Sequence, residues 1–320
     1  MTSPNDGARS PAPPDPFQGL LFLVGVAENK NLSYRSKMED VHTYVANFAE
    51  RLDWGYFAIF DGHAGKQAAR WCGNNLHVLL ENEILAREAE KEKAPYDIKE
   101  LLHTVFIRAD ERIEEEGFGS SGSTAAVAVL RWETDQKDLV EGSAGRALET
   151  SGYDFVPTKQ HRRVLYTANV GDLRIVLCRG GRLYRLTYDH KASDQSEVAR
   201  VRDLGGLVLK NRVNGVLAVT RALGDAYIKT LVTGKPFTTS TEIIREDEFL
   251  ILACDGVWDV ISDHTACRLV HDVFERQRQA GEPYDPPAAA RKLCQLAIEK
   301  ASTDNVTVMV VKLDPNILPA

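Results

Sequence analysis

The stretch FLILACDG at residues 249–256 joins a run of apolar residues to an aspartate-glycine pair that ends it. YFAIFDG at 56–62 has the same form, and DNVTVMVV at 304–311 reverses it, with Asp304 directly before the apolar run. Short apolar runs bounded by turn residues are typical of strands buried inside a sandwich of sheets. The three stretches therefore predict central β-strands, each with a carboxylate at one end.

Outside these three stretches, further strand-like runs alternate with amphipathic helices along the chain. Apolar residues from Ile98 to Ile113 follow the helical period, and Gly117 ends this segment. Arg179-Gly180-Gly181-Arg182 predicts a tight hairpin, because adjacent glycines accept the positive φ of primed turns. Strands are predicted at 19–27, 56–60, 125–132, 164–170, 174–178, 183–187, 207–210, 216–219, 249–254 and 306–313, and helices at 67–80, 98–116, 262–279 and 287–300. Consecutive strands joined by turns indicate antiparallel sheets and an α+β fold.

Composition limits the remaining possibilities. The 320 residues carry 39 Lys+Arg against 46 Asp+Glu, a net charge of −7, which argues against gripping nucleic acid or an anionic membrane through the overall field. The longest apolar stretch, 19–27, is too short to span a bilayer, and the five cysteines form no C-x-x-C pair. We predict a soluble intracellular protein, with a disordered leader at 1–18, one domain at 19–315 and an insertion loop at 134–163.

The strand-end carboxylates are the first candidates for chemistry. An aspartate beside glycine is most often a turn residue, but Asp61, Asp255 and Asp304 stand on three central strands. Adjacent strand ends would bring these like charges together, and such a group needs a cation. Oxygen-only ligands favour Mg²⁺ or Mn²⁺ over zinc. Glycine after Asp61 and Asp255 would let backbone approach the metal, and the carbonyl of Gly62 is a further ligand candidate.

Other polar residues near these motifs extend the candidate site. Glu39 and Asp40 are placed to hold metal-bound waters, and Asp172 is another strand-end aspartate. His63 follows Asp61 by two positions and suits a general acid, although a lone histidine is more often structural. Arg35 precedes Glu39 by four positions. It is either a surface ion-pair partner or a bidentate fork for phosphate.

In order along the chain, these motifs resemble those of the metal-dependent protein phosphatase 2C family, and most resemble the fungal type-1 enzymes. The resemblance runs from about residue 21 to 313. It is carried by GVAENKNLSYRSKMEDVH (25–42), FAIFDGHAGKQAA (57–69), GSTAAVAVL (122–130), YTANVGDLRIVL (166–177), DHKASDQSEVARVRDLGG (189–206), RVNGVLAVTRALGD (212–225), FLILACDGVWDVI (249–261) and TDNVTVMVV (303–311). The family fold is a four-layer α-β-β-α sandwich of two antiparallel sheets flanked by helix pairs, which agrees with the pattern of strands.

The resemblance implies a serine/threonine protein phosphatase with two Mg²⁺ or Mn²⁺ ions and a third, looser metal position. By this resemblance, Asp61 would bridge the two ions, the Gly62 carbonyl would bind one of them, and Asp255 and Asp304 would bind the other. Glu39 and Asp40 would hold metal-bound waters, and Asp172 with Asp255 would form the third metal position. Arg35 would bind the phosphate, and His63 would donate the proton to the leaving group. Residues 190–214 correspond to the family's flap. Leu173 departs from the family pattern, which often has serine directly after the Gly171-Asp172 pair.

The resemblance also implies partners and competing interpretations. Fungal type-1 members suggest phosphorylated stress-signalling MAP kinases as substrates, a monomeric protein, and a location in cytoplasm and nucleus. A catalytically silent phosphoprotein-binding scaffold of the same fold is the alternative. A nucleotide-binding enzyme, suggested by Ala64-Gly65-Lys66, lacks the remainder of a P-loop motif.

Overall fold

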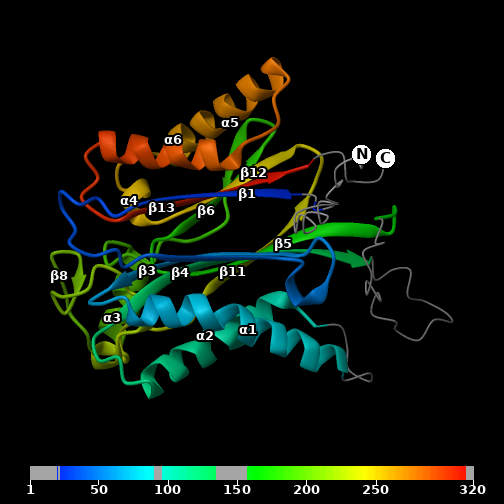
Figure 1. Cartoon of the computed structure of the whole chain (residues 1–320). Coiled ribbons are helices and arrows are strands. Elements are labelled where there is room, and N and C mark those ends of the chain that lie inside the picture. The colour runs from blue at the N-terminus through cyan, green and yellow to red at the C-terminus, as the bar shows by residue number, and fades with distance from the viewer. Residues whose placement is uncertain (1–19, 21, 90–95, 135–156, 315–320) are drawn as a thin grey trace, which may run out of the picture.

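Two antiparallel β-sheets lie face to face, and helices cover the outer face of each (Figure 1). The computed structural model describes residues 20, 22–89, 96–134 and 157–314, so the predicted leader at 1–18 and most of the predicted insertion at 134–163 lie outside the described residues. The layers follow the order helices, sheet, sheet, helices. The prediction of an α+β, four-layer α-β-β-α sandwich is confirmed.

The first sheet contains the strands that end at Asp255 and begin after Asp304. Its strand order is β1-β13-β12-β6-β7, with all pairs antiparallel. Gly180 and Gly181, with φ of 54° and 70°, form the predicted tight turn between two of these strands. The strands are β1 (Phe22–Asn29), β13 (Val306–Leu313), β12 (Asp247–Ala253), β6 (Arg174–Arg179) and β7 (Arg182–Arg185), and helices α5 (Asp263–Ala280) and α6 (Pro286–Glu299) cover this sheet.

The second sheet contains the strand that carries Asp61. Its strands are, in order, β11 (Phe237–Ile243), β5 (His161–Val170), β4 (Gly122–Thr134), β3 (Gly55–His63) and β2 (Val41–Ala46), with β10 (Leu223–Gly224) pairing to β4, and helices α1 (Gln67–Ala89) and α2 (Ile98–Glu115) cover it. Thr134 pairs with His161 across β4 and β5. Both ends of the predicted insertion are therefore strand, because the hydrogen-bonded ladder continues beyond the apolar residues.

Alternating side chains divide the interior into layers. Along β3, Phe57 and Ile59 point into the core between the sheets, whereas Tyr56 and Phe60 pack with the helices α1 and α2. Strand β12 alternates in the same way between the inter-sheet core and the core beneath α5 and α6. A strand buried on both faces needs no polar alternation, and each large apolar side chain buried in it contributes about 1.5–3 kcal/mol.

The remaining short elements gather mostly at one end of the sandwich (Figure 1). They are η1 (Phe48–Glu50), α3 (Gln195–Asp203), β8 (Val208–Leu209), β9 (Arg212–Val213), η3 (Ala226–Ile228) and α4 (Asp255–Trp258). The predicted strand at 216–219 is wrong: Gly215 (φ 74°) turns the chain, and Leu217 and Val219 make only isolated bridges. Their apolar character serves a small separate core around Val201 and Val213 instead. No helix in the described ranges is both long and apolar enough to cross a membrane.

Candidate metal centre

A cleft of about 600 Å³ opens at the end of the sandwich that carries α4 and the flap. The structure brings eight of the nine predicted site residues to its wall, and the ninth, Asp40, is buried just behind it with 2% of its surface exposed. The eight are Arg35, Glu39, Asp61, Gly62, His63, Asp172, Asp255 and Asp304. They come from both sheets, so the cleft exists only where the two sheets meet.

Close backbone contacts explain the glycines after Asp61 and Asp255. A Cβ on Gly62 would lie 2.7 Å from the carbonyl oxygen of Glu39, and one on Gly256 would lie 2.0 Å from that of Asn305. Both distances are far below van der Waals contact, so only glycine lets these segments approach. The glycines therefore let the carboxylate-bearing segments approach one another, whereas the sequence interpretation expected them to let backbone approach a metal.

Asn305 fastens the segment that carries Arg35 and Glu39. Its Oδ1 accepts a hydrogen bond from the Glu39 backbone N–H (2.8 Å), and its Nδ2 donates to the carbonyls of Lys30 (2.8 Å) and Lys37 (3.0 Å). The side chain is buried, so these bonds are shielded from water. Sequence reasoning missed this residue, although it lies in the quoted motif TDNVTVMVV.

The carboxylates at the bottom of the cleft repel one another. Burial, and then the neighbouring carboxylates, raise the pKa of Asp61 and that of Asp255 well above the usual range. Burial also raises the pKa of Asp40 to about 6, although its Oδ2 accepts a hydrogen bond from the Thr307 hydroxyl (2.6 Å). Oδ1 of Asp255 is buried and has no hydrogen-bond partner among the described residues. An orphaned carboxylate oxygen among like charges fits a hard divalent cation.

A buried thiol adjoins this group. Sγ of Cys254 and oxygens of Asp40 and Asp61 lie within 4.8 Å of one another. The thiol donates to the Asn305 carbonyl (3.4 Å) and accepts from the Thr307 N–H (3.2 Å), and burial raises its pKa well above the usual range. Cys254 is therefore held as a neutral, hydrogen-bonded core residue.

Arg35 stands at the rim of the cleft and forms an ion pair. Its Nη2 donates to Oδ2 of Asp304 (2.5 Å) and its Nε donates to the Thr303 carbonyl (3.1 Å), while 46% of its side chain is exposed. The surface ion pair that the sequence suggested is therefore present. The same half-exposed guanidinium also lines the cleft, which is compatible with the other interpretation, a donor to phosphate.

His63 pairs with a carboxylate that sequence reasoning missed. Its Nε2 lies 2.8 Å from both carboxylate oxygens of Asp225, whose side chain is fully buried. A Cβ on Gly122 would lie 2.2 Å from Oδ2 of Asp225 and 2.4 Å from Nε2 of His63, so the glycine leaves room for the pair. Asp225 adopts a left-handed backbone conformation (φ 54°) after Gly224. Its motif, RALGD, was quoted for the family resemblance, but only the fold reveals its partner.

Asp172 has a cationic neighbour already. Nζ of Lys191, a flap residue, lies 3.4 Å from Oδ2 of Asp172 and 2.8 Å from Oδ1 of Asp259. Burial nonetheless raises the pKa of Asp172. Leu173, where the family often has serine, is fully buried in the core between the sheets. Leucine in place of serine therefore affects the packing of the core between the sheets and replaces none of the carboxylates of the cleft.

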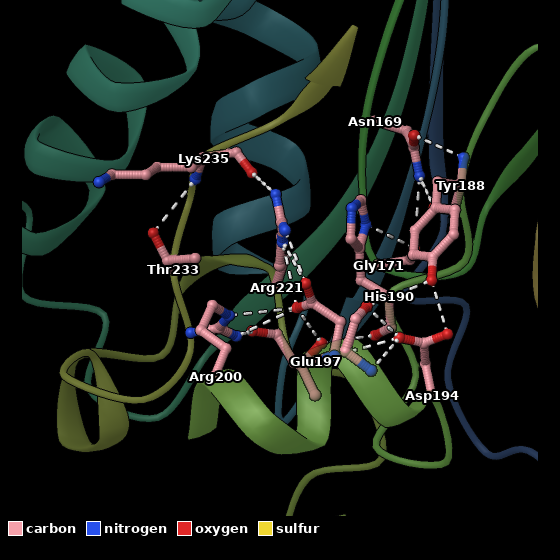
Figure 2. A network of polar contacts seen from close by, with 12 residues as sticks. Asn169, Gly171, Tyr188, His190, Asp194, Glu197, Arg200, Arg221, Thr233 and Lys235 are labelled. Atoms are coloured by element: carbon pink, nitrogen blue, oxygen red, sulfur yellow. Dashed lines mark hydrogen bonds and ion pairs between the residues drawn. The ribbon is translucent and has the colours of Figure 1, made fainter. Parts of the chain in front are cut away.

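A dense polar network holds the flap beside the cleft (Figure 2). The carboxylate of Glu197, 3% exposed, accepts hydrogen bonds from Nη2 of Arg221 (2.6 Å), the Thr220 hydroxyl (2.7 Å) and Nη2 of Arg200 (3.1 Å). Both arginines also donate to backbone carbonyls, including that of Lys235 (3.0 Å). Burial would raise the pKa of Glu197, but the bonds from Arg221 and Thr220 outweigh it and lower that pKa to about 2.

Fold and site together define a class of protein. Two antiparallel sheets flanked by helices carry, at one end, a cleft of carboxylates with an arginine at its rim and a paired histidine in its wall. Carboxylates that bind hard cations, a guanidinium for phosphate and an imidazole for proton transfer are the components of a metal-dependent phosphatase.

Comparison with known proteins agrees with this class. The family described as Protein phosphatase 2C matches residues 24–306. The chain is 53% identical over 301 residues to Protein phosphatase 2C homolog 1 of Saccharomyces cerevisiae, covering 94% of this chain and 96% of that protein. It is 41% identical to the protein of the same name from Schizosaccharomyces pombe, covering 94% and 76%. A solved phosphatase structure from Toxoplasma gondii superimposes with a TM-score of 0.70 at 22% identity, covering 93% and 94%, and supports the fold.

The chain therefore belongs to the protein phosphatase 2C family. Enzymes of this family are protein serine/threonine phosphatases that depend on Mg²⁺ or Mn²⁺, and the chain is an enzyme of this kind. The predicted family and enzyme class are confirmed.

Proposed function

We propose that the chain hydrolyses phosphoserine and phosphothreonine in proteins with two Mg²⁺ or Mn²⁺ ions held by the carboxylates of the cleft. The orphaned, buried Oδ1 of Asp255, together with the raised pKa of Asp255 and of the half-buried Asp61, carries this proposal. These groups destabilise the fold as anions, and a cation offsets that cost. A site that is unfavourable without its ligand and lies in an open cleft is expected to bind that ligand.

The carboxylates of the cleft would take different roles in binding the ions. Asp61 would contact both ions, with the Gly62 carbonyl on one and Asp255 and Asp304 on the other. Glu39 and Asp40 would hold ion-bound waters, and Asp172 with Asp255 would form the third position, where Lys191 competes for Asp172. When bound, the ions supply Lewis-acid stabilisation of phosphate charge and a nucleophilic water.

The side chains at the wall of the cleft would handle the substrate. Arg35, held at the rim through Asp304, would donate to two phosphate oxygens. His63 would donate a proton from Nδ1 to the departing serine or threonine oxygen, because its Nε2 is engaged by Asp225. Asp225 would hold the imidazole in a fixed orientation through its hydrogen bond to Nε2.

For substrates, we propose phosphorylated protein kinases of stress signalling, in particular MAP kinases, encountered by a monomeric enzyme in cytoplasm and nucleus. The support is the resemblance to fungal type-1 enzymes, together with 53% identity to a fungal relative over nearly the whole chain. A substrate-trapping pull-down with Asp61→Asn, probed for phosphothreonine-containing kinases, tests this. Capture of other phosphoproteins without such kinases would contradict it.

One assay separates the enzyme from the silent scaffold. The full chain is incubated with a phosphothreonine peptide and Mn²⁺, with and without excess EDTA. Release of phosphate that EDTA abolishes supports the proposal, with Asp61→Asn as the control for a contaminating phosphatase. Peptide binding without phosphate release would favour the scaffold, and full turnover in EDTA would exclude the metal centre.

A further inference from the structure

A second group of metal-ligand side chains lies outside the cleft. Sγ of Cys178, a carboxylate oxygen of Glu248 and a ring nitrogen of His271 lie within 4.8 Å of one another. Glu248 is at the start of β12 and Asp255 follows its end, so the two sites are separated by about 20 Å at the 3.3 Å rise of a strand. The group belongs to β6, β12 and α5, on the side of the first sheet that the helices cover (Figure 1).

The fold directs each of these side chains to the group. The register of β12 against β6 shifts between Asp247 and Phe249, which leaves Glu248 as the extra residue of a β-bulge. Bulges re-aim side chains, and here Oε1 of Glu248 accepts from the Gly181 N–H (2.9 Å) in the adjacent hairpin. Cys178 is fixed by strand pairing on both sides.

Helix α5 adds a second thiol. Cys267 lies four residues before His271, so both side chains share one face of the helix. The Cys267 thiol interacts with that of Cys178, and this contact, burial and the Glu248 carboxylate all raise the pKa of Cys178. Two thiols and a carboxylate thus meet at this point, and the ammonium of Lys312 donates to the backbone carbonyl of Glu248 (3.1 Å). The arrangement is rich in electron donors.

The spacing matches the requirements of a tetrahedral ion. Zinc bonds of about 2.0 Å to nitrogen or oxygen and 2.3 Å to sulfur, at the tetrahedral angle, place neighbouring ligand atoms about 3.3–3.6 Å apart. The structure has Sγ of Cys178 3.8 Å from Oε1 of Glu248, and Nδ1 of His271 2.8 Å from Oε2. These distances involve the two different oxygens of Glu248, and the three ligand atoms lie within 4.8 Å of one another, so side-chain movements of about an ångström would bring them to this spacing. His271, 40% exposed, leaves an approach from solvent.

We propose that Cys178, Glu248 and His271 bind one Zn²⁺ ion, with water in the fourth position. The mixed sulfur, nitrogen and oxygen set suits zinc and disfavours the hard cations of the cleft. Binding releases the thiol proton of Cys178 to solvent, and the ring proton of His271 that bridges Nδ1 to Oε2 of Glu248 moves to Nε2, so that Nδ1 can bind the ion. The ion ties β6 and β12 to α5, so it stabilises the folded state.

The test titrates Zn²⁺ into the full chain, with excess Mg²⁺ to fill the cleft, a non-thiol reductant and a competing chelator. We expect one tight site per chain, a melting temperature that rises with Zn²⁺, and, with Co²⁺ as probe, the absorption of a thiolate–cobalt bond. Cys178→Ser and His271→Ala are each expected to weaken binding at least about 100-fold, since losing a mere supporting group costs about 10–100-fold.

Matched variants separate this site from other thiols and from the cleft. His264→Ala removes an exposed imidazole from the same helix, and Cys294→Ser removes a buried thiol of α6; both are expected to keep the tight site. Asp61→Asn is expected to keep the thiolate–cobalt absorption. Its loss there but not in Cys178→Ser would assign the signal to Cys254 and overturn the proposal. Unchanged Zn²⁺ affinity in folded His271→Ala would also overturn it.

Discussion

The cleft and the flap each bury carboxylates at the same end of the sandwich, but they treat the charge in opposite ways. Glu197 in the flap meets two arginines and a hydroxyl, and its pKa falls to about 2. Asp61 and Asp255 in the cleft meet other carboxylates, and their pKa rises. Burial is common to both, so the partners decide the outcome. The flap is complete without a ligand, whereas the cleft needs one.

The largest difference between the two regions is expected in activity. Asp61→Ala should lower turnover of a phosphothreonine peptide on the order of 10⁴-fold or more, because losing one stabilising contact already costs about 10²–10³-fold and this change would remove the proposed ligand of both ions. Peptide kinetics at saturating Mn²⁺ measure the effect. The metal-free melting temperature should not fall. A clearly greater loss from Asp255→Ala or Asp304→Ala would contradict the bridging role.

His63 and Asp225 form an intermediate case, a buried carboxylate whose partner faces the cleft. His63→Gln should slow hydrolysis of a phosphothreonine peptide between about 10²- and 10⁴-fold, the usual range for general acid catalysis. Turnover of p-nitrophenyl phosphate should change far less, because its leaving group is a stabilised phenolate. Comparison of kcat on both substrates measures this. Equal slowing would mean that the histidine only positions the site.

The polar network of the flap should contribute measurably to the free energy of unfolding. Glu197→Gln leaves two partly exposed guanidinium groups without their buried carboxylate, and breaking a fully buried ion pair costs about 3–5 kcal/mol, which sets the upper bound. Denaturant unfolding, with hydrogen exchange over residues 190–214, measures the loss. Glu275→Gln, which breaks a surface pair with Arg278 (2.7 Å), is the matched control and should change little. Equal effects in both variants would remove the distinction between the two regions.

Arg35 places a positive charge from the protein itself, rather than from a bound ion, at the rim of the cleft. Arg35→Ala should raise KM for phosphopeptide roughly ten- to more than a hundredfold, because a charge-assisted hydrogen bond is worth about 1.5–3 kcal/mol. Metal affinity, measured by calorimetry, should be retained. An unchanged KM would reduce Arg35 to the surface ion pair with Asp304.

The smallest effects should appear in the pH dependence of metal-free stability. Glu197 has a folded pKa of about 2 against an ordinary value of 4.5, so its contribution is present above pH 4.5 and is lost as pH falls through about 2. Asp40 has a folded pKa of about 6 against 3.8, so its contribution is present below pH 3.8 and is lost as pH rises through about 6. Each slope is at most about 1.4 kcal/mol per pH unit.

Melting curves from pH 2 to 8 in EDTA measure both slopes. Glu197→Gln should flatten the acid side, and Asp40→Asn should flatten the side above pH 4. Added Mn²⁺ should reverse the loss at higher pH, because it binds the ionised carboxylates. A metal-free protein that grows more stable from pH 4 to 7 would contradict the description of the cleft.

The sequence predicted the strands best where both faces are buried. The run at 306–313 matches strand β13 and the run at 249–254 overlaps strand β12 (Asp247–Ala253), and every side chain in both runs is buried. Both edge strands of the second sheet were missed: VHTYVA (41–46) and FTTSTEI (237–243) are mostly polar or half-exposed and carry no apolar run. The run at 216–219 misled because apolar residues also pack irregular segments such as the flap.

The candidate site, like the fold, could be predicted only in part from the sequence. Aspartates beside glycine at strand ends could be found one by one, and the structure gathers them as expected. Asp225 and Asn305 could not be assigned, because their importance lies in partners 162 and 266 positions away, His63 and Glu39. Glu197 likewise resembles any helix-start glutamate until Arg221 is placed beside it. Partners across the fold depend on tertiary structure, which local patterns do not encode.

The pairing of β1 with β13 has a consequence for biosynthesis. The two strands are matched along their full length, from Phe22 with Leu313 to Asn29 with Val306. Roughly 280 residues separate them, so a ribosome adding about 5–20 residues per second leaves β1 waiting about 15–60 s for its neighbour. Asp304 emerges with that neighbour. The nascent chain is therefore expected to be inactive until β13 has been synthesised, and β1 lacks its partner strand during that interval.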